Sequence, residues 1–404
     1  MSISKRILTF FMAFILIFVG NGIYCSADTD ETPLDPQGQM TGTEETEVDT
    51  VPDMGLTCGA AVLMEASSGT VLYRMNETDE LTPASVTKIM TLLLVMEALE
   101  AGNLALTDMV TISGYAASMG GSQVFLEEGE QMSVEDLIKC TVIASANDAA
   151  VALAEQVMGS ETAFVERMNQ RAAELGLMGA HFENVTGLDD DTENHVMSAM
   201  DIAVISRELI RHPLILEYSS VWMDTIRDGA FTLTNTNRLI RFYQGATGLK
   251  TGSTEKAKFC ITATAERNGM TLIAVIMTAP SRDDRNSDAK KLFDWGFANW
   301  GVYRDAEEEL GPVKVSRGLR DSVKGIKSTV TKVLPKAKIG SVEKQISLEP
   351  GVQAPIQAGT QIGTVTYLSD GEIIETAPIL AAETVEEIGF WQLIGRMMKI
   401  LLLS

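Results

Sequence analysis

The chain has 404 residues, of which 45% are hydrophobic, and a formal net charge of −23 at pH 7. This length exceeds one ordinary domain and predicts two domains with appended segments. The acidic balance excludes a nucleic-acid partner, which requires a basic surface, and indicates a solvated acidic one.

The N-terminal segment, residues 1–27, has the pattern of a secretory signal peptide. Lys5 and Arg6 precede an apolar run over residues 7–19, and small residues follow at Ser26-Ala27. A positive start, an apolar centre and a small-residue cleavage site define such signals. The alternative is an uncleaved anchor helix, although the apolar run is short for a bilayer span. With either reading we expect the remaining chain to be exported.

Residues 28–53 contain nine acidic residues and neither lysine nor arginine. Few large apolar residues interrupt this run, so it cannot bury enough surface to fold. The composition predicts a disordered acidic linker.

Residues 54–300 mix strand and helix patterns. Two strands are expected around a turn at residues 67–69, and another two around Asn268-Gly269, a strong hairpin signal. Helical patterns cover residues 85–100, 133–144, 149–159, 160–176 and 285–300, with Ser133 and Asp148 as expected N-terminal caps. This order predicts an α/β fold, in which an antiparallel sheet is flanked by helices.

After Gly301 the pattern changes. Residues 301–385 are rich in Val, Ile, Thr and Gly, and Asp370-Gly371 predicts a further hairpin. We expect a small all-β domain, followed over residues 386–404 by a C-terminal helix.

This C-terminal helix is expected to be amphipathic. At helical spacing its polar face holds Gln392, Gly395, Arg396 and Lys399, and large apolar residues cover the rest. Sixteen helical residues span about 24 Å, which is too short to cross a bilayer core. A basic stripe beside a broad apolar face predicts a helix lying in the membrane interface. The alternative is a helix docked on the protein's own core.

Cysteine and histidine give no sign of a metal or redox site. After removal of the expected signal peptide, which contains Cys25, three cysteines remain: Cys58, Cys140 and Cys260. This odd number and their apolar neighbours predict buried free thiols and no complete disulfide framework. The three histidines lack the spacing of zinc ligands. We therefore expect neither metal nor cofactor.

The pair Ser85 and Lys88 is the first candidate for chemistry. A serine is a weak nucleophile until a base removes its proton, and a lysine can be that base if burial or a nearby positive charge lowers its pKa. Residues three apart share one face of a helix. The S-x-x-K spacing recurs elsewhere, for example at Ser287–Lys290, but only Ser85 opens a buried helix. Alone, the pair could equally be a capping serine and a lysine that reaches solvent.

Two further motifs favour the catalytic interpretation of Ser85 and Lys88. Ser145-Ala146-Asn147 is the only S-x-N in the chain and falls between two predicted helices. Lys250-Thr251-Gly252 is the only K-T-G; it is followed by Ser253 and stands just before a predicted strand. A glycine at a strand edge lets a substrate backbone approach closely. Taken singly, these are a capped turn and a polar loop.

In the order S-x-x-K, S-x-N, K-T-G, the three motifs together are specific for penicillin-binding proteins and class A β-lactamases. The sequence resembles the penicillin-recognising serine enzymes, and most closely the D-alanyl-D-alanine carboxypeptidases among low-molecular-mass penicillin-binding proteins. The resemblance covers nearly the whole chain and includes TPASVTKIMT, SANDAA, FENVTGL and GLKTGST. It implies a transpeptidase-like α/β domain followed by a small β domain.

The resemblance also implies a role for each motif residue. Ser85 matches the acylated nucleophile and Lys88 its general base. Ser145 matches a proton relay, and Asn147 a contact to the substrate amide and to Lys88. Lys250 and Thr251 match the site of the terminal carboxylate, beside Gly252, and the N–H groups of Ser85 and Ser253 an oxyanion hole. The implied substrate is the peptidoglycan pentapeptide stem, which loses its terminal D-alanine, and β-lactams acylate the same serine. The implied location is the outer face of the bacterial cytoplasmic membrane.

One departure concerns an arginine that assists carboxylate binding in relatives. It is expected beside the apolar run of the second hairpin strand, where this chain has Thr271, with Arg267 nearby. His195, Ser198 and Asp201 match another stretch of the family and are expected to be structural supports.

Three alternatives remain at this point. A D,D-endopeptidase could use the same site on peptidoglycan cross-links. A class A-like β-lactamase would need a glutamate-bearing loop that the sequence does not display, and it has no use for residues 302–404. A non-catalytic peptidoglycan-binding protein is the third alternative, against which the intact motif set argues.

Overall fold

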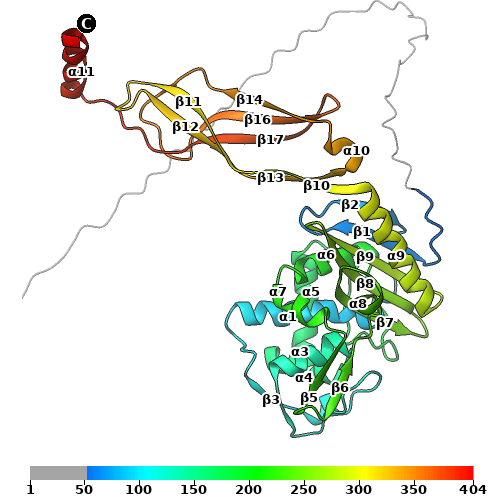
Figure 1. The fold of residues 1–404 in the computed structure, drawn as a ribbon. Coiled ribbons are helices and arrows are strands. Elements are labelled where there is room, and N and C mark those ends of the chain that lie inside the picture. The colour runs from blue at the N-terminus through cyan, green and yellow to red at the C-terminus, as the bar shows by residue number, and fades with distance from the viewer. Residues whose placement is uncertain (1–51, 404) are drawn as a thin grey trace, which may run out of the picture. The chain divides into compact units, whose positions relative to one another are not determined.

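The computed structural model describes residues 52–403 (Figure 1). The expected signal peptide lies outside the described residues, as does the expected linker except for its last two residues. The three cysteines at positions 58, 140 and 260 are buried free thiols, as predicted.

A five-stranded antiparallel sheet is the centre of the first folded region. Its strand order is β2-β1-β9-β8-β7. The strands are β1 (Ala60–Glu65), β2 (Val71–Met75), β7 (Ala246–Thr254), β8 (Lys258–Arg267) and β9 (Met270–Ala279). Both predicted hairpins are present, because β1 pairs with β2 and β8 with β9. The strand β7, which carries the K-T-G motif, pairs only with β8 and is therefore an edge strand.

Helices cover both faces of this sheet. They are η1 (Ala84–Thr87, a 3₁₀ turn), α1 (Lys88–Glu100), α2 (Gly114–Ala117), α3 (Val134–Ile143), α4 (Asn147–Met158), α5 (Glu161–Glu174), α6 (Ala199–Leu209), α7 (Pro213–Ser219), α8 (Leu239–Phe242) and α9 (Arg282–Asn299). Two short hairpins accompany them: β3 (Met109–Thr111) with β4 (Gln131–Ser133), and β5 (Met223–Ile226) with β6 (Phe231–Thr234).

The alternation of side chains along β1 explains the two layers. Ala60, Val62 and Met64 join the core formed with helices α1 to α6, whereas Ala61 and Leu63 join the core formed with α9. Successive strand residues point to opposite faces, so a continuous apolar strand buries both. Figure 1 shows α9 along one face of the sheet and α6 on the other. The predicted fold class is confirmed.

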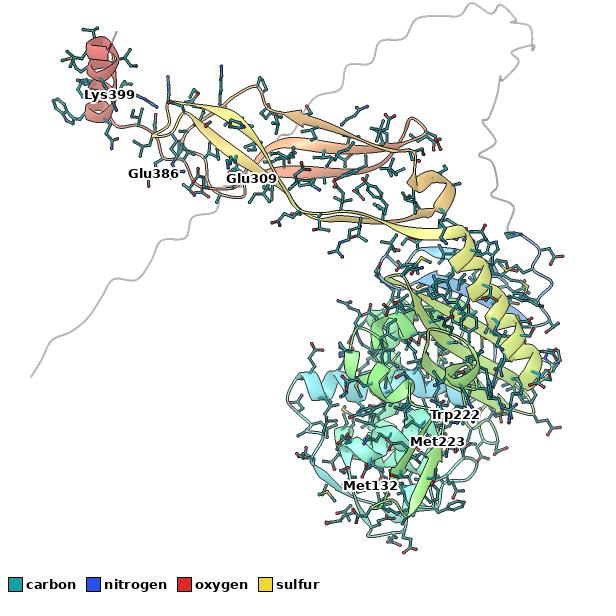
Figure 2. All side chains as sticks on the ribbon, in the orientation of Figure 1. Met132, Trp222, Met223, Glu309, Glu386 and Lys399 are labelled. Carbon is teal, nitrogen blue, oxygen red and sulfur yellow. The ribbon has the colours of Figure 1, made fainter. Side chains whose placement is uncertain are left out.

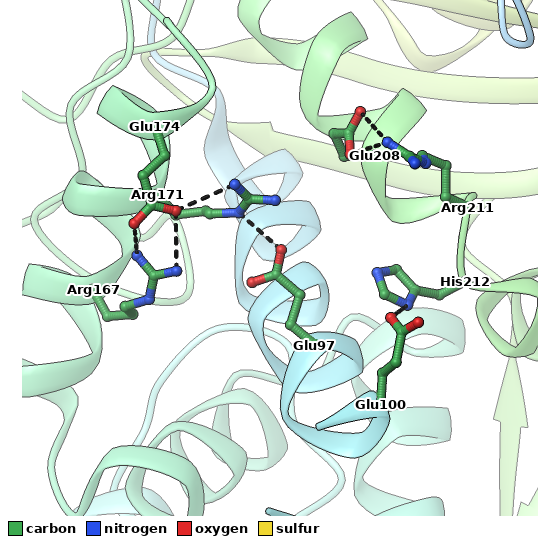
Figure 3. Close-up of polar contacts among 8 residues, drawn as sticks. All are labelled: Glu97, Glu100, Arg167, Arg171, Glu174, Glu208, Arg211 and His212. Carbon is green, nitrogen blue, oxygen red and sulfur yellow. Dashed lines mark hydrogen bonds and ion pairs between the residues drawn. The ribbon is translucent and has the colours of Figure 1, made fainter. Parts of the chain in front are cut away.

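Ion pairs hold the C-terminal half of α1 to its neighbours (Figure 3). Arg171 of α5 donates to Glu97 of α1 over 2.8 Å, and His212 lies 3.2 Å from Glu100. These partly exposed pairs orient the helix more than they stabilise it. They leave the N-terminal end of α1, where Lys88 lies, to be fixed by buried contacts.

Two local predictions were wrong. Ser85 does not open the α-helix; it lies in the 3₁₀ turn η1, and the α-helix begins at Lys88. Asp148 does not cap α4, whose N-cap is Ala146. Its carboxylate instead accepts hydrogen bonds from the backbone N–H groups of Val124 and Leu126, since the loop that holds them needs a buried acceptor. Ser133 does cap α3.

The second folded region is an all-β domain, as predicted. Its strands are β10 (Trp300–Asp305), β11 (Glu308–Ser316), β12 (Ser322–Lys327), β13 (Val330–Pro335), β14 (Val342–Leu348), β15 (Val352–Gln353), β16 (Gln361–Ser369) and β17 (Glu372–Ala381), with one helical turn, α10 (Lys336–Ile339). The hairpin at Asp370-Gly371 joins β16 to β17. Its core includes the fully buried Tyr367, whose hydroxyl donates to Asp305.

The last helix is α11 (Phe390–Leu403). Most of its large apolar side chains are exposed, Trp391 by 80% and Ile400 by 66%. No helix within residues 52–403 is both long and apolar enough to cross a membrane.

Candidate active site

Ser85 lies in η1, which we call the serine turn (residues 84–87). The turn bends sharply, because Ala84 has φ of +50°, a left-handed conformation that a residue with a Cβ rarely adopts. Gly252 of β7 packs against this turn: a Cβ at that position would lie 2.8 Å from the Pro83 carbonyl oxygen and 2.9 Å from the Ser85 nitrogen. The glycine of K-T-G therefore makes room for the serine turn, whereas the sequence suggested that it makes room for a substrate backbone.

Lys88 is fully buried at the start of α1. Its Nζ lies 3.1 Å from Ser85 Oγ, 2.5 Å from Asn147 Oδ1 and 2.8 Å from the Thr186 carbonyl oxygen. Because none of these three neighbours is charged, no direct partner compensates an ammonium at this position. The predicted pair is thus in hydrogen-bonding contact.

Burial is the main cause that lowers the pKa of Lys88 well below its ordinary value of 10.5, and the positive charge of Lys250 adds to it. Asp148 acts in the opposite direction and raises the pKa. Its carboxylate is nevertheless occupied by backbone N–H groups, including that of Ala149. The balance favours the neutral form of the amine more than in a free lysine, and a neutral amine can accept a proton.

The S-x-N motif occupies the connection between α3 and α4. Ser145 is buried with φ of +66°, a strained conformation that turns the chain between the two helices. Asn147 begins α4 and is fixed at both ends of its amide, because Nδ2 donates to the Gly120 carbonyl over 2.7 Å while Oδ1 accepts from Lys88. The motif thus supplies one oriented amide and one oriented hydroxyl.

The K-T-G motif lies within β7. Lys250 is fully buried, and its Nζ donates to Ser145 Oγ over 2.7 Å and to the Thr251 carbonyl over 2.8 Å. Burial first, and then the charge of Arg285, lower the pKa of Lys250 to about 7. Thr251 is held by a 2.7 Å bond to Thr236 Oγ1, and Ser253 is exposed at the end of the strand.

A cleft of about 440 Å³ joins these groups. It is lined by Ser85, Ser122, Ser145, Trp222, Thr234, Asn235, Thr236, Arg238, Thr251, Gly252, Ser253, Arg282 and Arg285. The structure therefore brings together on one cleft, or directly beneath it, all eight residues predicted from the motifs. Trp222, labelled in Figure 2 beside Met223 of β5, forms part of its wall.

The sequence did not reveal the arginines of this cleft. Arg285 lies in the first turn of α9 and is 3% exposed, and burial is the main cause that lowers its pKa to about 10. The expected place beside Thr271 is not at the cleft; Arg267 instead binds the Gln244 carbonyl and covers the ring of Tyr243. Arg285 was missed because it stands in a polar helix start, and only the long-range contact of α9 with the sheet gives it meaning.

Three residues expected to be supports have different partners. Ser198 and Asp201 form a reciprocal capping box at the start of α6, which confirms a structural role. His195 is buried, and its Nε2 lies 2.8 Å from Thr87 Oγ1 in the serine turn.

Within residues 52–403, no group of three or more His, Cys, Asp or Glu side chains is arranged to hold a metal ion.

Comparison with known proteins agrees with this geometry. The family described as D-alanyl-D-alanine carboxypeptidase matches residues 46–281, and the C-terminal domain of penicillin-binding protein 5 matches residues 304–387. The D-alanyl-D-alanine carboxypeptidase DacF of Bacillus subtilis (strain 168) is 41% identical over 346 residues, which are 84% of this chain and 88% of that protein. The chain belongs to the D-alanyl-D-alanine carboxypeptidase family.

Solved structures of the same family share the fold. Penicillin-binding protein 5 from Haemophilus influenzae has 35% identity and a TM-score of 0.71, over 82% of this chain and 98% of that one. Penicillin-binding protein D2 from Listeria monocytogenes, solved in an ampicillin-bound form, has 33% identity and a TM-score of 0.54, over 61% of this chain and 99% of that one. The predicted family is confirmed.

The contact of Gly252 with the serine turn generates a prediction for this carboxypeptidase-family chain. In Gly252→Ala the new methyl group would overlap the Pro83 carbonyl and the Ser85 N–H, so the turn must shift. We expect acylation by penicillin to slow by about 10²-fold, the cost of an ångström-scale misplacement. Gly340→Ala is the matched control, because nothing lies within 4 Å of its Cβ position. Equal acylation rates for Gly252→Ala and wild type would contradict this account.

Proposed function

We propose that the chain is a serine-type D-alanyl-D-alanine carboxypeptidase. It removes the terminal D-alanine from peptidoglycan pentapeptides through an acyl-enzyme on Ser85. The observation that carries the proposal is the contact of a fully buried, directly uncompensated Lys88 with Ser85 Oγ. This arrangement supplies an activated nucleophile without a histidine.

The hydrogen bonds of Lys88 support its role as the general base. A neutral amine has two N–H bonds and one lone pair. Asn147 Oδ1 and the Thr186 carbonyl can accept hydrogen bonds from the two N–H groups. The lone pair is then free to accept the Ser85 hydroxyl proton. A positioned base of this kind contributes about 10²–10⁴-fold to a rate.

The positions of the other motif residues suggest the role of each in the reaction. Ser145, which accepts from Lys250, is placed to pass a proton toward the departing D-alanine amine. Arg285 gives the cleft wall a positive charge for the terminal carboxylate, the Thr251 hydroxyl lies on the same wall, and Lys250 is buried beneath it. The N–H groups of Ser85 and Ser253 form the oxyanion hole, a feature whose donors are each worth about 10²–10³-fold.

The reaction runs in two steps. Ser85 Oγ attacks the carbonyl of the penultimate D-alanine while Lys88 takes its proton, and the terminal D-alanine leaves as its amine is protonated. Water then attacks the acyl-enzyme, and Ser85 is released. A β-lactam acylates the same oxygen, since its strained amide takes the place of the D-alanyl-D-alanine bond; the ampicillin-bound relative supports this.

A D,D-endopeptidase is the second candidate, because the cleft extends past the motif residues to Trp222 and Arg238. Such space could admit the larger leaving group of a cross-link. The β-lactamase alternative is disfavoured, because the match to the penicillin-binding protein 5 C-terminal domain covers residues that such enzymes do not need.

The first test of this function is penicillin acylation followed by mass spectrometry. Wild type is expected to gain one penicillin mass, and Ser85→Ala is expected to gain none. The same wild-type preparation is then given a pentapeptide and a cross-linked dimer. Release of D-alanine from the pentapeptide alone supports the carboxypeptidase, cleavage of the dimer supports the endopeptidase, and the absence of a wild-type adduct would refute both.

We also propose that the protein is exported and acts at the outer face of the bacterial cytoplasmic membrane, held peripherally by α11. The signal pattern of residues 1–27 supports export. The exposed apolar side chains of α11, including Phe390 and Met397, support insertion into the interface. Lys399, labelled in Figure 2, adds a positive charge that suits an anionic lipid surface.

A vesicle flotation assay tests the anchor on signal-cleaved protein. Protein that ends at residue 388 is expected to stay at the bottom of the gradient, whereas protein with α11 floats with vesicles containing anionic lipid. The double variant Trp391→Ser and Ile400→Ser keeps the length of the chain and should also lose flotation, because it removes two exposed apolar groups. Unchanged flotation after the deletion would refute the proposal.

A further inference from the structure

His195 is a buried titratable group that the proposed reaction does not use. It is 2% exposed and lies on the segment before α6, with its ring edge-on to Phe182 at a centroid distance of 5.8 Å. Both of its nitrogens have protein partners. Nε2 lies 2.8 Å from Thr87 Oγ1, and Nδ1 accepts the backbone N–H of Glu183 over 3.1 Å.

The direction of each hydrogen bond in this cluster is determined. Thr87 has one hydroxyl proton, and it donates that proton to the Ala84 carbonyl over 2.8 Å. The hydroxyl oxygen must therefore accept a hydrogen bond from His195, so Nε2 must carry a proton. Independently, Nδ1 faces a donor and must be unprotonated. Two separate constraints thus select the same neutral tautomer.

This chain of bonds ends on the strained residue next to Ser85. Ala84 holds φ of +50°, and such a conformation persists only where its surroundings over-determine it. The carbonyl of Ala84 is fixed by the Thr87 hydroxyl, which is oriented in turn by His195. Gly187 packs against both the carbonyl and this hydroxyl, because a Cβ there would lie 1.9 Å from the Ala84 oxygen and 2.7 Å from Thr87 Oγ1.

We propose that His195 is a positioning residue for the nucleophile, acting through Thr87 and the Ala84 carbonyl to hold Ser85 within reach of Lys88. The inference rests on the proposed role of Ser85 in acylation. His195 does not touch Ser85; it sets the conformation of the turn from which Ser85 projects. Thr87 is the link, since its hydroxyl contacts both the histidine and the Ala84 carbonyl.

The surroundings of His195 keep it neutral, as the two hydrogen bonds require. The charged groups that face it are Glu183 and Asp189, which raise its pKa, and His181 and Lys256, which lower it. Burial outweighs them and lowers the pKa of His195 to about 4. Because this value lies below the ordinary 6.5, the neutral ring stabilises the fold above pH 6.5, and that contribution is lost as the pH falls toward 4.

Isosteric substitutions of two threonines test the inference. Thr87→Val removes the hydroxyl and keeps the shape, and Thr87→Ser restores the hydroxyl. Thr91→Val is the matched control: Thr91, in α1, is likewise buried, and its hydroxyl donates to the Val185 carbonyl over 2.7 Å, on the segment next to Gly187, and not to the Ala84 carbonyl. Thermal unfolding of all three establishes that folded proteins are compared.

The measured quantity is the rate of acylation by a fluorescent penicillin, separated into the noncovalent affinity and the first-order acylation step. We expect Thr87→Val to slow the first-order step by about 10-fold or more, an effect of misplacement, with little change in affinity. Thr87→Ser is expected to recover most of the rate, and Thr91→Val to acylate like wild type even if it unfolds earlier. Acylation of Thr87→Val within twofold of wild type would overturn the inference, as would a Thr87→Ser variant as slow as Thr87→Val.

A second measurement does not depend on any variant being folded. The ¹⁵N shifts of the His195 ring in wild type are expected to report a protonated Nε2 and an unprotonated Nδ1 from pH 5 to pH 8. The opposite tautomer, or protonation near the ordinary pKa of 6.5, would overturn the inference. These outcomes are distinct from failure of the proposed function, in which wild type itself forms no penicillin adduct.

Discussion

Two lysine side chains, Lys88 and Lys250, are buried in one site, and no carboxylate of residues 52–403 is bonded to either. Burying an ammonium costs several kcal/mol unless a counter-ion compensates it, so the site lowers the proton affinity of both amines. Asp148, the carboxylate whose charge raises the pKa of Lys88, is occupied by three backbone N–H groups. The site therefore favours a neutral amine that can act as a base, at the cost of stability, and the surrounding structure supplies that stability.

The surrounding structure supplies this stability through contacts between segments that are far apart in the chain. The serine turn is pressed between β7, through Gly252, and the segment around Gly187. Asn147 ties Lys88 to the α3–α4 connection, and Lys250 ties that connection to β7. Both glycines lie at positions where a Cβ would collide with backbone, which is the least yielding kind of neighbour. The site is therefore rigid before any substrate arrives, as electrostatic catalysis requires.

The sequence predicted this site well because its chemistry is encoded in short spacings. Ser85 and Lys88 meet through a local separation of three residues, and Lys250 was found through its K-T-G motif, although the motif lies within the strand β7 and was predicted to lie just before a strand. It did not predict the distorted turn around Ala84, because a left-handed alanine has no local signature and depends on Thr87, Gly187 and Gly252 together. For the same reason Arg285 escaped notice: its local pattern is that of a solvated helix start.

The fold shows the same division between local and long-range information. Hairpins at Asn268-Gly269 and Asp370-Gly371 were predictable, because those dipeptides favour the turn by themselves. The role of Asp148 was not predictable, because a carboxylate at a helix start can cap that helix or can accept hydrogen bonds from a distant loop. Burial and partner choice are properties of the assembled core, and they decide what a charged residue does.

The central claim is that Lys88 is a neutral amine in the folded, unacylated enzyme. The direct measurement is an NMR titration of the lysine Cε and Nζ resonances in isotopically labelled protein, with Lys88→Arg and Lys250→Arg used for assignment. The account predicts a Lys88 resonance that titrates well below the ordinary 10.5, and a Lys250 resonance that titrates at about 7. A Lys88 that stays protonated up to pH 10 in the folded enzyme would contradict it.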